Sequence, residues 1–282
     1  MINILMKNLL IVNMVNCHYE IIETFIINYK DLFKINEDLN IFICCFNNSN
    51  YIEYIKNKYK FILFNKKPKI IDYYINCTMN QNNINKIVNN NNYIYISHRF
   101  YDKLLTYKNI YFLTPLCNIN RYIYTDILPY KNQKKNNNIP IYIIQGNITS
   151  SRRYYKLLEE ILKNKYKYEF KIKIIGRGKI PNNLLKYKNK IILKNNLNFI
   201  NYHKEFLDGY CILPLITKNT HKQYYTNTLT SSINYARGYN LLCLIDKDLQ
   251  NIYKLDNVEI FNNINDISEK FNNTLINFYN KK

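Results

Sequence analysis

Short apolar runs alternate with amphipathic stretches along the whole chain. In the first half, runs rich in β-branched and aromatic residues predict strands at 9–14, 41–45, 61–64, 93–96 and 110–113. Helical spacing of apolar residues follows the first two runs, and a further helix is indicated around 84–88. Strands that alternate with helices are typical of βαβ units, so this half predicts a parallel sheet.

The second half has the same rhythm, with a more regular pattern. Its predicted strands are 141–144, 170–175, 191–193, 210–215 and 241–245. Its predicted helices are 152–162, 199–206, 229–237 and 264–278, and Gly238 is the expected C′ residue of the third. The fold class is therefore α/β, with one parallel sheet in each half.

A polar run at 131–138, mostly Lys and Asn, separates the halves and is the best linker candidate. We place the domain boundary there, with an N-terminal domain at 1–130 and a C-terminal domain at 139–282. Whether the last helix packs back toward the N-terminal domain is left open. With 282 residues and 47% hydrophobic residues, the chain can fill the cores of two medium domains.

The stretch after the boundary carries the clearest candidate site. The strand 141–144 is followed by Gly146 and Asn147, which are expected to break it, and Arg152 and Arg153 open the next predicted helix. At such a junction, backbone N–H groups and the helix dipole face an anion, and guanidinium groups bind its oxygens. An ordinary strand–helix turn with two solvated arginines is the alternative.

Four loops of the second half are expected at the carboxyl ends of the parallel strands, the edge where open α/β sheets bind ligands. They are 145–153, 176–179, 214–228 and the helix start at 230–232. Gly176-Arg177-Gly178 lacks the third glycine of a dinucleotide-binding fingerprint and is not a P-loop. Taken alone, it also fits a tight turn after a strand.

Composition adds two observations. The five glycines, at 146, 176, 178, 209 and 238, all lie in the second half, and in so biased a chain they indicate backbone conformations or close approaches that need glycine. The net charge of +20 would attract polyanions, membranes or anionic substrates. However, enrichment in Lys, Asn, Ile and Tyr is the profile of an AT-rich genome, as in some large DNA viruses, protists or reduced bacterial genomes. The lysines are spread along the chain, so nucleic-acid binding is the weaker hypothesis.

Cysteine usage and the N-terminus bear on location. The seven cysteines form no C-x-x-C pair, which favours reduced thiols in the cytoplasm, or the host cytoplasm if the source is viral. No cluster has metal-ligand spacing, so neither a metal nor a cofactor is expected. The apolar N-terminus is interrupted by polar residues and is too short to span a bilayer. Peripheral contact of a basic N-terminal face with acidic lipids stays open, as does the oligomeric state.

In order and spacing, the second half resembles the nucleotide-sugar-binding domain of GT-B glycosyltransferases, nearest the large group 1 family (family 4). The similar segments are IYIIQGNITSSRRYYKLLEEIL, FKIKIIGRG, FINYHKEFLDGYCILPLI and YYTNTLTSSINYARGYNLLCLID, roughly 139–246. The resemblance implies two Rossmann-like domains with parallel sheets facing across a cleft. It also implies metal-independent transfer of a sugar from a nucleotide-diphosphate sugar to a hydroxyl of a glycan, lipid or protein acceptor.

The resemblance assigns donor binding by position. Gly146 would approach the diphosphate, and Arg152 or Arg153 would neutralise the charge on the departing nucleoside diphosphate. The implied donor-binding residues are Gly146, Asn147, Arg152, Arg153, Gly176, Gly178, Tyr225, Thr228, Ser231 and Ser232. The family commonly carries two glutamates in this region, whereas here no carboxylate occurs between Asp208 and Asp246. Three alternatives stay open. Tyr225 and the Ser and Thr hydroxyls of this region substitute for the glutamates, the donor chemistry differs, or the protein is an inactive binding protein of this fold.

Two histidines of the first half are, with Arg153, the catalytic candidates. His18 follows the first strand and His98 follows the strand 93–96, both at carboxyl ends. An imidazole with a near-neutral pKa can activate an acceptor hydroxyl or stabilise charge near the anomeric carbon. A surface or capping histidine is the alternative for each.

Overall fold

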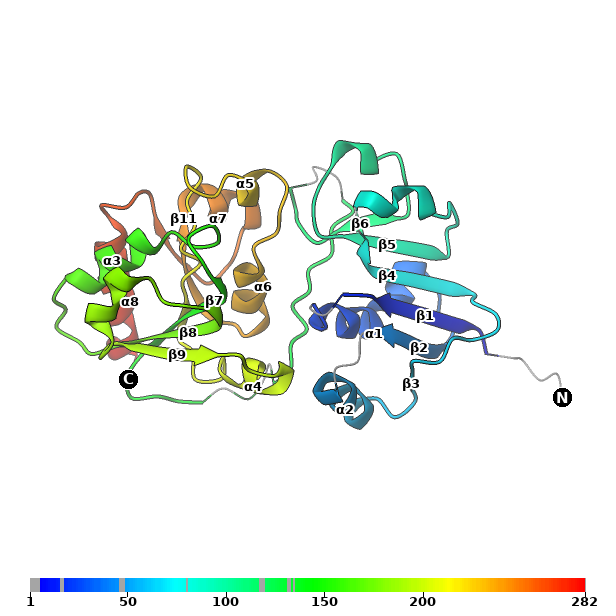
Figure 1. Ribbon diagram of the computed structural model, residues 1–282, viewed down its shortest axis with the longest axis horizontal. Coiled ribbons are helices and arrows are strands. Elements are labelled where there is room, and N and C mark those ends of the chain that lie inside the picture. Colours follow the sequence, from blue (N-terminus) through cyan, green and yellow to red (C-terminus); the bar gives the residue numbers. More distant parts are fainter. Residues whose placement is uncertain are drawn as a thin grey trace. The chain divides into compact units, whose positions relative to one another are not determined.

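The computed structural model describes residues 6–15, 18–45, 49–79, 81–116, 120–130, 133 and 135–281. The chain divides into two compact units, Met1–Ile127 and Leu128–Lys282, and each contains a six-stranded sheet (Figure 1). Leu128 is buried in the core of the second unit, and the Tyr239 hydroxyl donates to the Pro129 carbonyl at 3.0 Å. The second unit therefore begins before the polar run 131–138.

The sheet of the first unit has the strand order β3-β2-β1-β4-β5-β6, and its pairs are parallel. This is the order of doubly wound dinucleotide-binding sheets. The strands are β1 (Asn8–Asn13), β2 (Asn40–Cys45), β3 (Leu63–Phe64), β4 (Tyr73–Met79), β5 (Tyr93–Ser97) and β6 (Ile110–Phe112). The helices are α1 (Glu20–Phe33) and α2 (Ser49–Lys58), with 3₁₀ turns η1 (Gln81–Lys86) and η2 (Asp102–Leu104).

Strand β4 was missing from the sequence prediction. It lies in the middle of the sheet, between β1 and β5, and every second residue from Tyr73 to Met79 is buried. Asn76 and Thr78 occupy the alternate, partly exposed positions, which disguised the strand as a polar stretch. The predicted helix around 84–88 is the 3₁₀ turn η1, which ends at Lys86.

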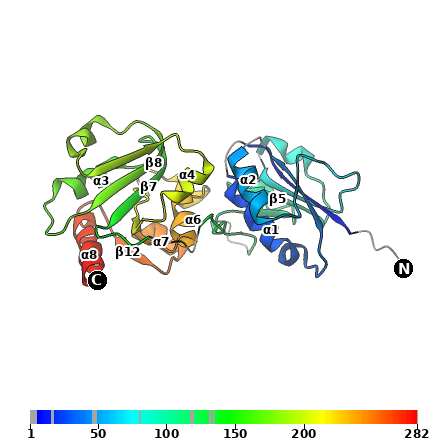
Figure 2. The ribbon, with the colours of Figure 1, turned by 90° about the horizontal axis from the view of Figure 1, so that it is seen from below.

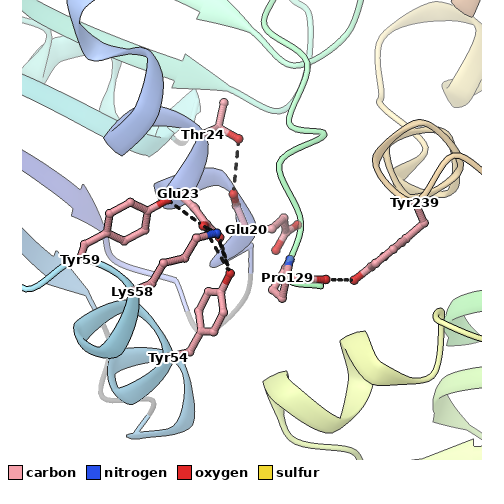
Figure 3. A network of polar contacts seen from close by, with 8 residues as sticks. All are labelled: Glu20, Glu23, Thr24, Tyr54, Lys58, Tyr59, Pro129 and Tyr239. Atoms are coloured by element: carbon pink, nitrogen blue, oxygen red, sulfur yellow. Dashed lines mark hydrogen bonds and ion pairs between the residues drawn. The ribbon is translucent and has the colours of Figure 1, made fainter. Parts of the chain in front are cut away.

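A buried carboxylate joins α1 to α2. The Glu23 side chain, 1% exposed, accepts from Lys58 Nζ at 2.5 Å, from the Tyr59 hydroxyl at 3.0 Å and from the Tyr54 hydroxyl at 3.1 Å (Figure 3). A buried carboxylate costs free energy unless it is paired and hydrogen-bonded, and here both conditions are met. The network holds α2 against the first helix, whose first residue, Glu20, follows the candidate His18 closely.

The second unit repeats the architecture with the order β12-β11-β10-β7-β8-β9, again with parallel pairs. The strands are β7 (Ile141–Ile148), β8 (Lys171–Gly178), β9 (Ile191–Asn195), β10 (Cys211–Ile212), β11 (Leu242–Asp246) and β12 (Val258–Phe261). The helices are α3 (Tyr155–Lys163), α4 (Phe199–Lys204), α5 (Gln223–Thr226), α6 (Ser231–Gly238), α7 (Lys247–Tyr253) and α8 (Ile267–Asn280), with a 3₁₀ turn η3 (Asn182–Tyr187). The pattern had not predicted α5, α7 or β12.

Two separate cores cover the two faces of this sheet. Tyr142 and Ile144 of β7 face the core formed with α3 and α8, and Ile143 between them faces the core formed with α4, α5, α6 and α7 (Figure 2). The alternation follows from the two-residue period of a strand, and burial on both faces explains the nearly continuous apolar run. The two Rossmann-like domains expected from the sequence are thus confirmed.

Three local predictions in the second unit were wrong. Gly146 and Gly176 do not end their strands: β7 and β8 continue to Ile148 and Gly178, and Gly146 pairs with Gly176. Parallel pairing holds both glycines in the ladder, so they act at a close strand contact, not as breakers. Arg152 and Arg153 do not open the helix, because α3 begins at Tyr155. They lie in the turn before it.

The expected cap at Gly238 was also wrong. Gly238 is the last residue of α6, and the left-handed position after the helix is taken by Asn240, with φ of 51°. The Leu241 N–H bonds back to the Ala236 carbonyl at 2.9 Å and the Asn240 N–H to the Arg237 carbonyl at 3.2 Å. This is a Schellman-type ending in which asparagine does the work usually done by glycine.

Candidate functional site

The candidate site lies where the winding of the second sheet reverses. β7 pairs with β8 on one side and with β10 on the other, so the loops that follow β7 and β10 leave toward opposite faces. In open α/β sheets, ligands bind outside the carboxyl ends of the strands at such a switch point. The turn with Arg152 and Arg153 follows β7, and the loop leading to α6 follows β10.

Arg153 is a buried cation at this edge. Its side chain is 4% exposed, and its guanidinium donates to the Arg152 carbonyl at 2.7 Å, to Ser232 Oγ at 3.3 Å and to the Gln145 carbonyl. Among the described residues no carboxylate forms an ion pair with it, and its Nε–H has no acceptor. Burial lowers the pKa of Arg153 from its usual value, but an arginine stays charged at neutral pH. Neutral protein dipoles therefore surround a full positive charge.

Gln145 connects this cation to the start of α6, and the sequence reasoning had passed over it. Its side-chain amide donates to Ser231 Oγ at 2.9 Å and to Ser232 Oγ at 3.2 Å, while its oxygen accepts from the Tyr202 hydroxyl at 2.8 Å. A polar residue at the end of an otherwise apolar strand was the available signal, because such a residue must find buried partners. The structure thus brings Arg153, Ser231 and Ser232 together.

The first turn of α6 faces this cluster without a side-chain cap. Thr230, the N-cap residue, is 1% exposed, and its hydroxyl has no partner among the described residues. No acidic residue lies in the first turn. Free N–H groups at a helix start and the positive end of the helix dipole favour an anion, and a buried hydroxyl without a partner is costly. Both features suit a negatively charged ligand.

Glycine shapes the same edge. Gly146 has φ of +103°, and a Cβ atom there would lie 3.1 Å from Arg153 Nη2. A side chain at this position would crowd the guanidinium, so glycine lets the cation approach the strand backbone. Asn147 is exposed after it, and Gly178 is exposed at the paired end of β8.

Arg152 is the exposed member of the arginine pair. Its Nη1 donates to the Tyr224 hydroxyl at 3.2 Å, which ties it to α5. Beside it, His221 Nε2 lies 3.2 Å from the Ser150 carbonyl and Nδ1 lies 2.8 Å from Thr220 Oγ1. Burial and the positive charge of Arg153 lower the pKa of His221, so this imidazole is neutral at pH 7 and braces the turn.

Tyr225, in α5, and Thr228, in the loop after it, lie between β10 and α6, and both hydroxyls are hydrogen-bonded within the protein. The Tyr225 hydroxyl donates to Asp246 Oδ1 at 2.9 Å and to the Ile216 carbonyl at 3.3 Å, and burial raises its pKa above the usual value. Thr228 Oγ1 donates to Asn227 Oδ1 at 2.8 Å. Asp246 also caps α7, so Tyr225 links this loop to the end of β11.

In the first unit, His18 and His98 come together. They follow β1 and β5, and their ring centroids are 4.4 Å apart. His98 Nε2 lies 3.3 Å from the Cys77 carbonyl, which can only accept, so this nitrogen carries the hydrogen. Burial and the neighbouring His18 hold the pKa of His98 well below its usual value, so it is neutral at pH 7. The pair is a neutral imidazole with a second imidazole against it.

His18 has the features of the more reactive member. Its Nδ1 lies 3.4 Å from Glu20 Oε1, and its backbone is in the left-handed region with φ of 60°. A carboxylate at Nδ1 orients an imidazole and fixes which ring nitrogen carries the hydrogen, so the other nitrogen can accept a proton. Left-handed backbone at a non-glycine residue is costly and gathers at functional sites. Glu20, in the first turn of α1, is the carboxylate in this contact.

Neither a metal cluster nor a membrane span is found within the described ranges. No three side chains of His, Cys, Asp and Glu gather there in a way that could hold a metal ion. None of the helices in this part of the chain has the length and apolar character that crossing a bilayer requires. The five cysteines described are free, and four of them are buried.

Comparison with solved structures identifies the architecture. A glycosyltransferase from Rickettsia africae ESF-5 superposes with a TM-score of 0.57 at 12% identity, covering 97% of this chain and 89% of that one. AviGT4, a glycosyltransferase involved in avilamycin A biosynthesis, superposes with a TM-score of 0.56 at 8% identity, covering 96% of this chain and 88% of that one. The apo form of the lipopolysaccharide outer core galactosyltransferase WaaB superposes with a TM-score of 0.51 at 12% identity, covering 97% of this chain and 91% of that one. No family model and no curated protein sequence matches the chain, so its place in the group 1 family stays a prediction. The protein has the GT-B glycosyltransferase fold.

Proposed function

We propose that the protein is a glycosyltransferase that moves a sugar from a nucleotide-diphosphate sugar to an acceptor hydroxyl. One observation carries the proposal: at the switch point of a GT-B-fold sheet, a buried guanidinium without a carboxylate partner among the described residues lies beside a helix start. A buried charge is expensive unless something of opposite sign completes it. A departing diphosphate is such a group, because negative charge grows on it as the glycosidic bond breaks.

In this proposal the two arginines have different tasks. Arg152, exposed and steadied by Tyr224, contacts the phosphate oxygens directly. Arg153 is held behind the backbone of Gly146 and contributes a fixed positive field that needs no reorganisation when charge develops. The N–H groups of the first turn of α6, beside Ser231 and Ser232, bind the second phosphate. These groups supply positive charge without requiring a metal ion.

On the acceptor side, we propose that His18 removes the proton from the attacking hydroxyl. Glu20 orients its imidazole, and neutral His98 packs against it without adding a competing charge. A base with a near-neutral pKa is suited to this step.

A second candidate function is that of an inactive binding protein with the same donor site. It is favoured by the absence of the glutamate pair that the resembling family commonly carries. The two differ in one measurable respect, since both would bind a nucleoside diphosphate but only the transferase would cleave the sugar from its conjugate. The third candidate, a nucleic-acid binder, draws only on the net charge of +20.

A thermal-shift panel of UDP, GDP and their sugar conjugates tests the proposal. We expect one nucleoside diphosphate to raise the melting temperature, since a ligand at about 100 times its Kd stabilises the folded state by about 2.7 kcal/mol. Arg152→Ala should reduce this shift, whereas Arg237→Gln, near the other end of α6, should leave it intact. Hydrolysis or transfer with the matching sugar conjugate would then separate the transferase from the binding protein.

No shift with any nucleotide, together with steeply salt-dependent binding of DNA or RNA, would overturn both of the first two candidates. Salt dependence identifies that outcome because counterion release dominates nucleic-acid binding.

Replacing His18 with Asn is expected to lower kcat about 100-fold, the lower end of what general-base catalysis contributes. Asparagine accepts the left-handed backbone of this position, so the fold should be retained. The rise of kcat with pH that reports the base should disappear in the variant. Glu20→Gln should lower kcat less and shift that pH profile. An unchanged profile in His18→Asn would remove His18 from the mechanism.

A further inference from the structure

A lysine-rich segment contains the edge strand of the first sheet and continues to the start of β1, where the Asn8 side chain donates to the Ile70 carbonyl at 3.0 Å. Residues 56–70, which we call the basic edge, contain six lysines, at 56, 58, 60, 66, 67 and 69, and no Asp or Glu. β3 lies within it, pairs with β2 on one side and is the outermost strand of the sheet (Figure 1). Although lysine is common throughout this chain, a run of this length without an acid is a local concentration of positive charge.

Large apolar side chains are exposed in the same segment. Phe61 is 62% exposed, Leu63 42% and Ile70 68%, while Ile62 between the first two is buried. The alternation shows that Ile62 anchors the segment to the core, so Phe61 and Leu63 point outward. Single exposed apolar residues are ordinary, but here three of the ten residues 61–70 are large, apolar and exposed within one lysine-rich segment.

Most of the charge on the basic edge is uncompensated. Lys58 is paired with Glu23, and Lys56 Nζ lies 5.7 Å from the centre of the Phe64 ring. Across the described ranges, Lys60, Lys66, Lys67 and Lys69 form no ion pair. Four exposed ammonium groups are thus available to a negatively charged partner.

We propose that the basic edge binds the surface of membranes that contain anionic lipids. Phe61, Leu63 and Ile70 enter the headgroup region, and the lysines stay at the level of the lipid phosphates. Side chains with an apolar body beside lysines are what interfacial binding uses, and lysine stems extend so that the ammonium remains in water. Each lysine near such a surface contributes about 1 kcal/mol, or about fivefold in partitioning.

The aliphatic residues decide between a membrane and a nucleic acid. A single-stranded nucleic acid would use the lysines, and its bases could stack on Phe61, but Leu63 and Ile70 offer no stacking surface. A membrane uses both aliphatic and aromatic side chains. The proposal does not rest on the donor site or on the transfer reaction, so either can fail without the other.

Vesicle co-sedimentation tests the proposal with the full chain. We expect binding to vesicles of phosphatidylcholine mixed with phosphatidylserine, weaker binding to phosphatidylcholine alone, and release as salt is added. The variant Lys66→Gln/Lys67→Gln/Lys69→Gln should lower partitioning to the mixed vesicles on the order of 100-fold. Ile70→Ser should lower it about tenfold, since an exposed apolar side chain loses its insertion. Neither variant removes a buried side chain, so both should unfold like the parent chain.

Matched variants in the second unit control for charge and for exposed apolar surface. Lys165→Gln/Lys167→Gln/Lys188→Gln removes the same charge from exposed positions, and Leu185→Ser removes a side chain that is 53% exposed. Both should bind vesicles like the parent chain. If they weaken binding as much as the basic-edge variants, attraction is nonspecific and the proposal is overturned. It is equally overturned if mixed vesicles are not bound, or if Ile70→Ser binds them normally while the triple lysine variant loses affinity for RNA.

Discussion

Arg153→Met is expected to lower turnover about 1000-fold while the chain remains folded, because one preorganised charge at a developing anion is worth about that factor. The charge of Arg153 is desolvated, and its acceptors are the Gln145 and Arg152 carbonyls and Ser232 Oγ. Methionine fills a similar volume without a charge. A neutral side chain removes the field at the phosphates and leaves the position of Arg152 unchanged.

The same variant also allows a prediction about the free energy of unfolding. A buried charge without a carboxylate destabilises the fold, so Arg153→Met should change the free energy of unfolding by less than about 1 kcal/mol in either direction, with the lost hydrogen bonds offset by the relieved desolvation. Sites that keep a costly charge do so for function. Arg153→Lys, which keeps the charge but not the fork of donors, should retain part of the turnover.

Lys173 provides the matched control, because it is also a buried cation in this sheet. Its Nζ lies 2.6 Å from Asp208 Oδ1 and 3.0 Å from Glu205 Oε2, so its charge is compensated inside the protein. Lys173→Met should therefore destabilise the fold by about 3 kcal/mol, because it removes the cation paired with Asp208, whereas Glu205 keeps its ion pair with Lys194 at 3.3 Å. If Arg153→Met keeps wild-type turnover, or costs as much stability as Lys173→Met, Arg153 is structural and the proposed role is wrong.

Strands with continuous apolar runs were predicted from the sequence. Strands in which polar and apolar residues alternate were missed. β1 and β7 are buried on both faces, and their continuous apolar runs identified them as strands. β4 was hidden because Asn76 and Thr78 occupy alternate positions, although the buried period of two from Tyr73 to Met79 was present. Periodicity would have found this strand where a search for apolar runs did not.

The sequence placed several candidate residues at one edge of the sheet but could not give their arrangement, and their role in donor binding stays a prediction. Arginines, serines and glycines of separate segments were expected at one edge, and Gln145, Arg153, Ser231 and Ser232 do share hydrogen bonds there. No local pattern could tell that Arg153 points inward and Arg152 outward, because this depends on where α3 begins. The contact of Tyr225 could not be predicted from sequence either, since its partner Asp246 lies 21 residues away at the end of β11.

Gly146 and Gly176 were read correctly as positions that need glycine for the backbone, but the predicted geometry was wrong. A glycine after an apolar run usually signals a turn, and this expectation placed the strand ends at Gly146 and Gly176. In the structure the two glycines are partners across parallel strands. Whether two glycines on different strands lie opposite each other depends on the register of the strands, and the register is set by the whole pair of strands.

That register gives the largest stability effect we expect in the second unit, from Gly176→Ala. A Cβ atom at Gly176 would lie 1.7 Å from the Gly146 carbonyl oxygen and 2.7 Å from its carbon. Both atoms belong to the backbone of the neighbouring strand, so no rotamer change can relieve the overlap. β7 and β8 would have to separate at their carboxyl ends, which breaks ladder hydrogen bonds and displaces Gln145 and Arg153. We expect a loss of at least about 3 kcal/mol in the free energy of unfolding.

Chemical denaturation followed by circular dichroism measures this loss, and the first unit serves as an internal reference because its unfolding should not change. Arg177→Ala, at the exposed next position, should stay within about 0.5 kcal/mol of the parent chain. Gly146→Ala should cost about 1–2 kcal/mol for its left-handed backbone, because the atom it approaches is the end of the Arg153 side chain. Gly176→Ala that unfolds at the parent denaturant concentration would mean that the two strands do not approach this closely. In that case, the positions of Gln145, Arg153 and Ser232 could not depend on a close contact between β7 and β8.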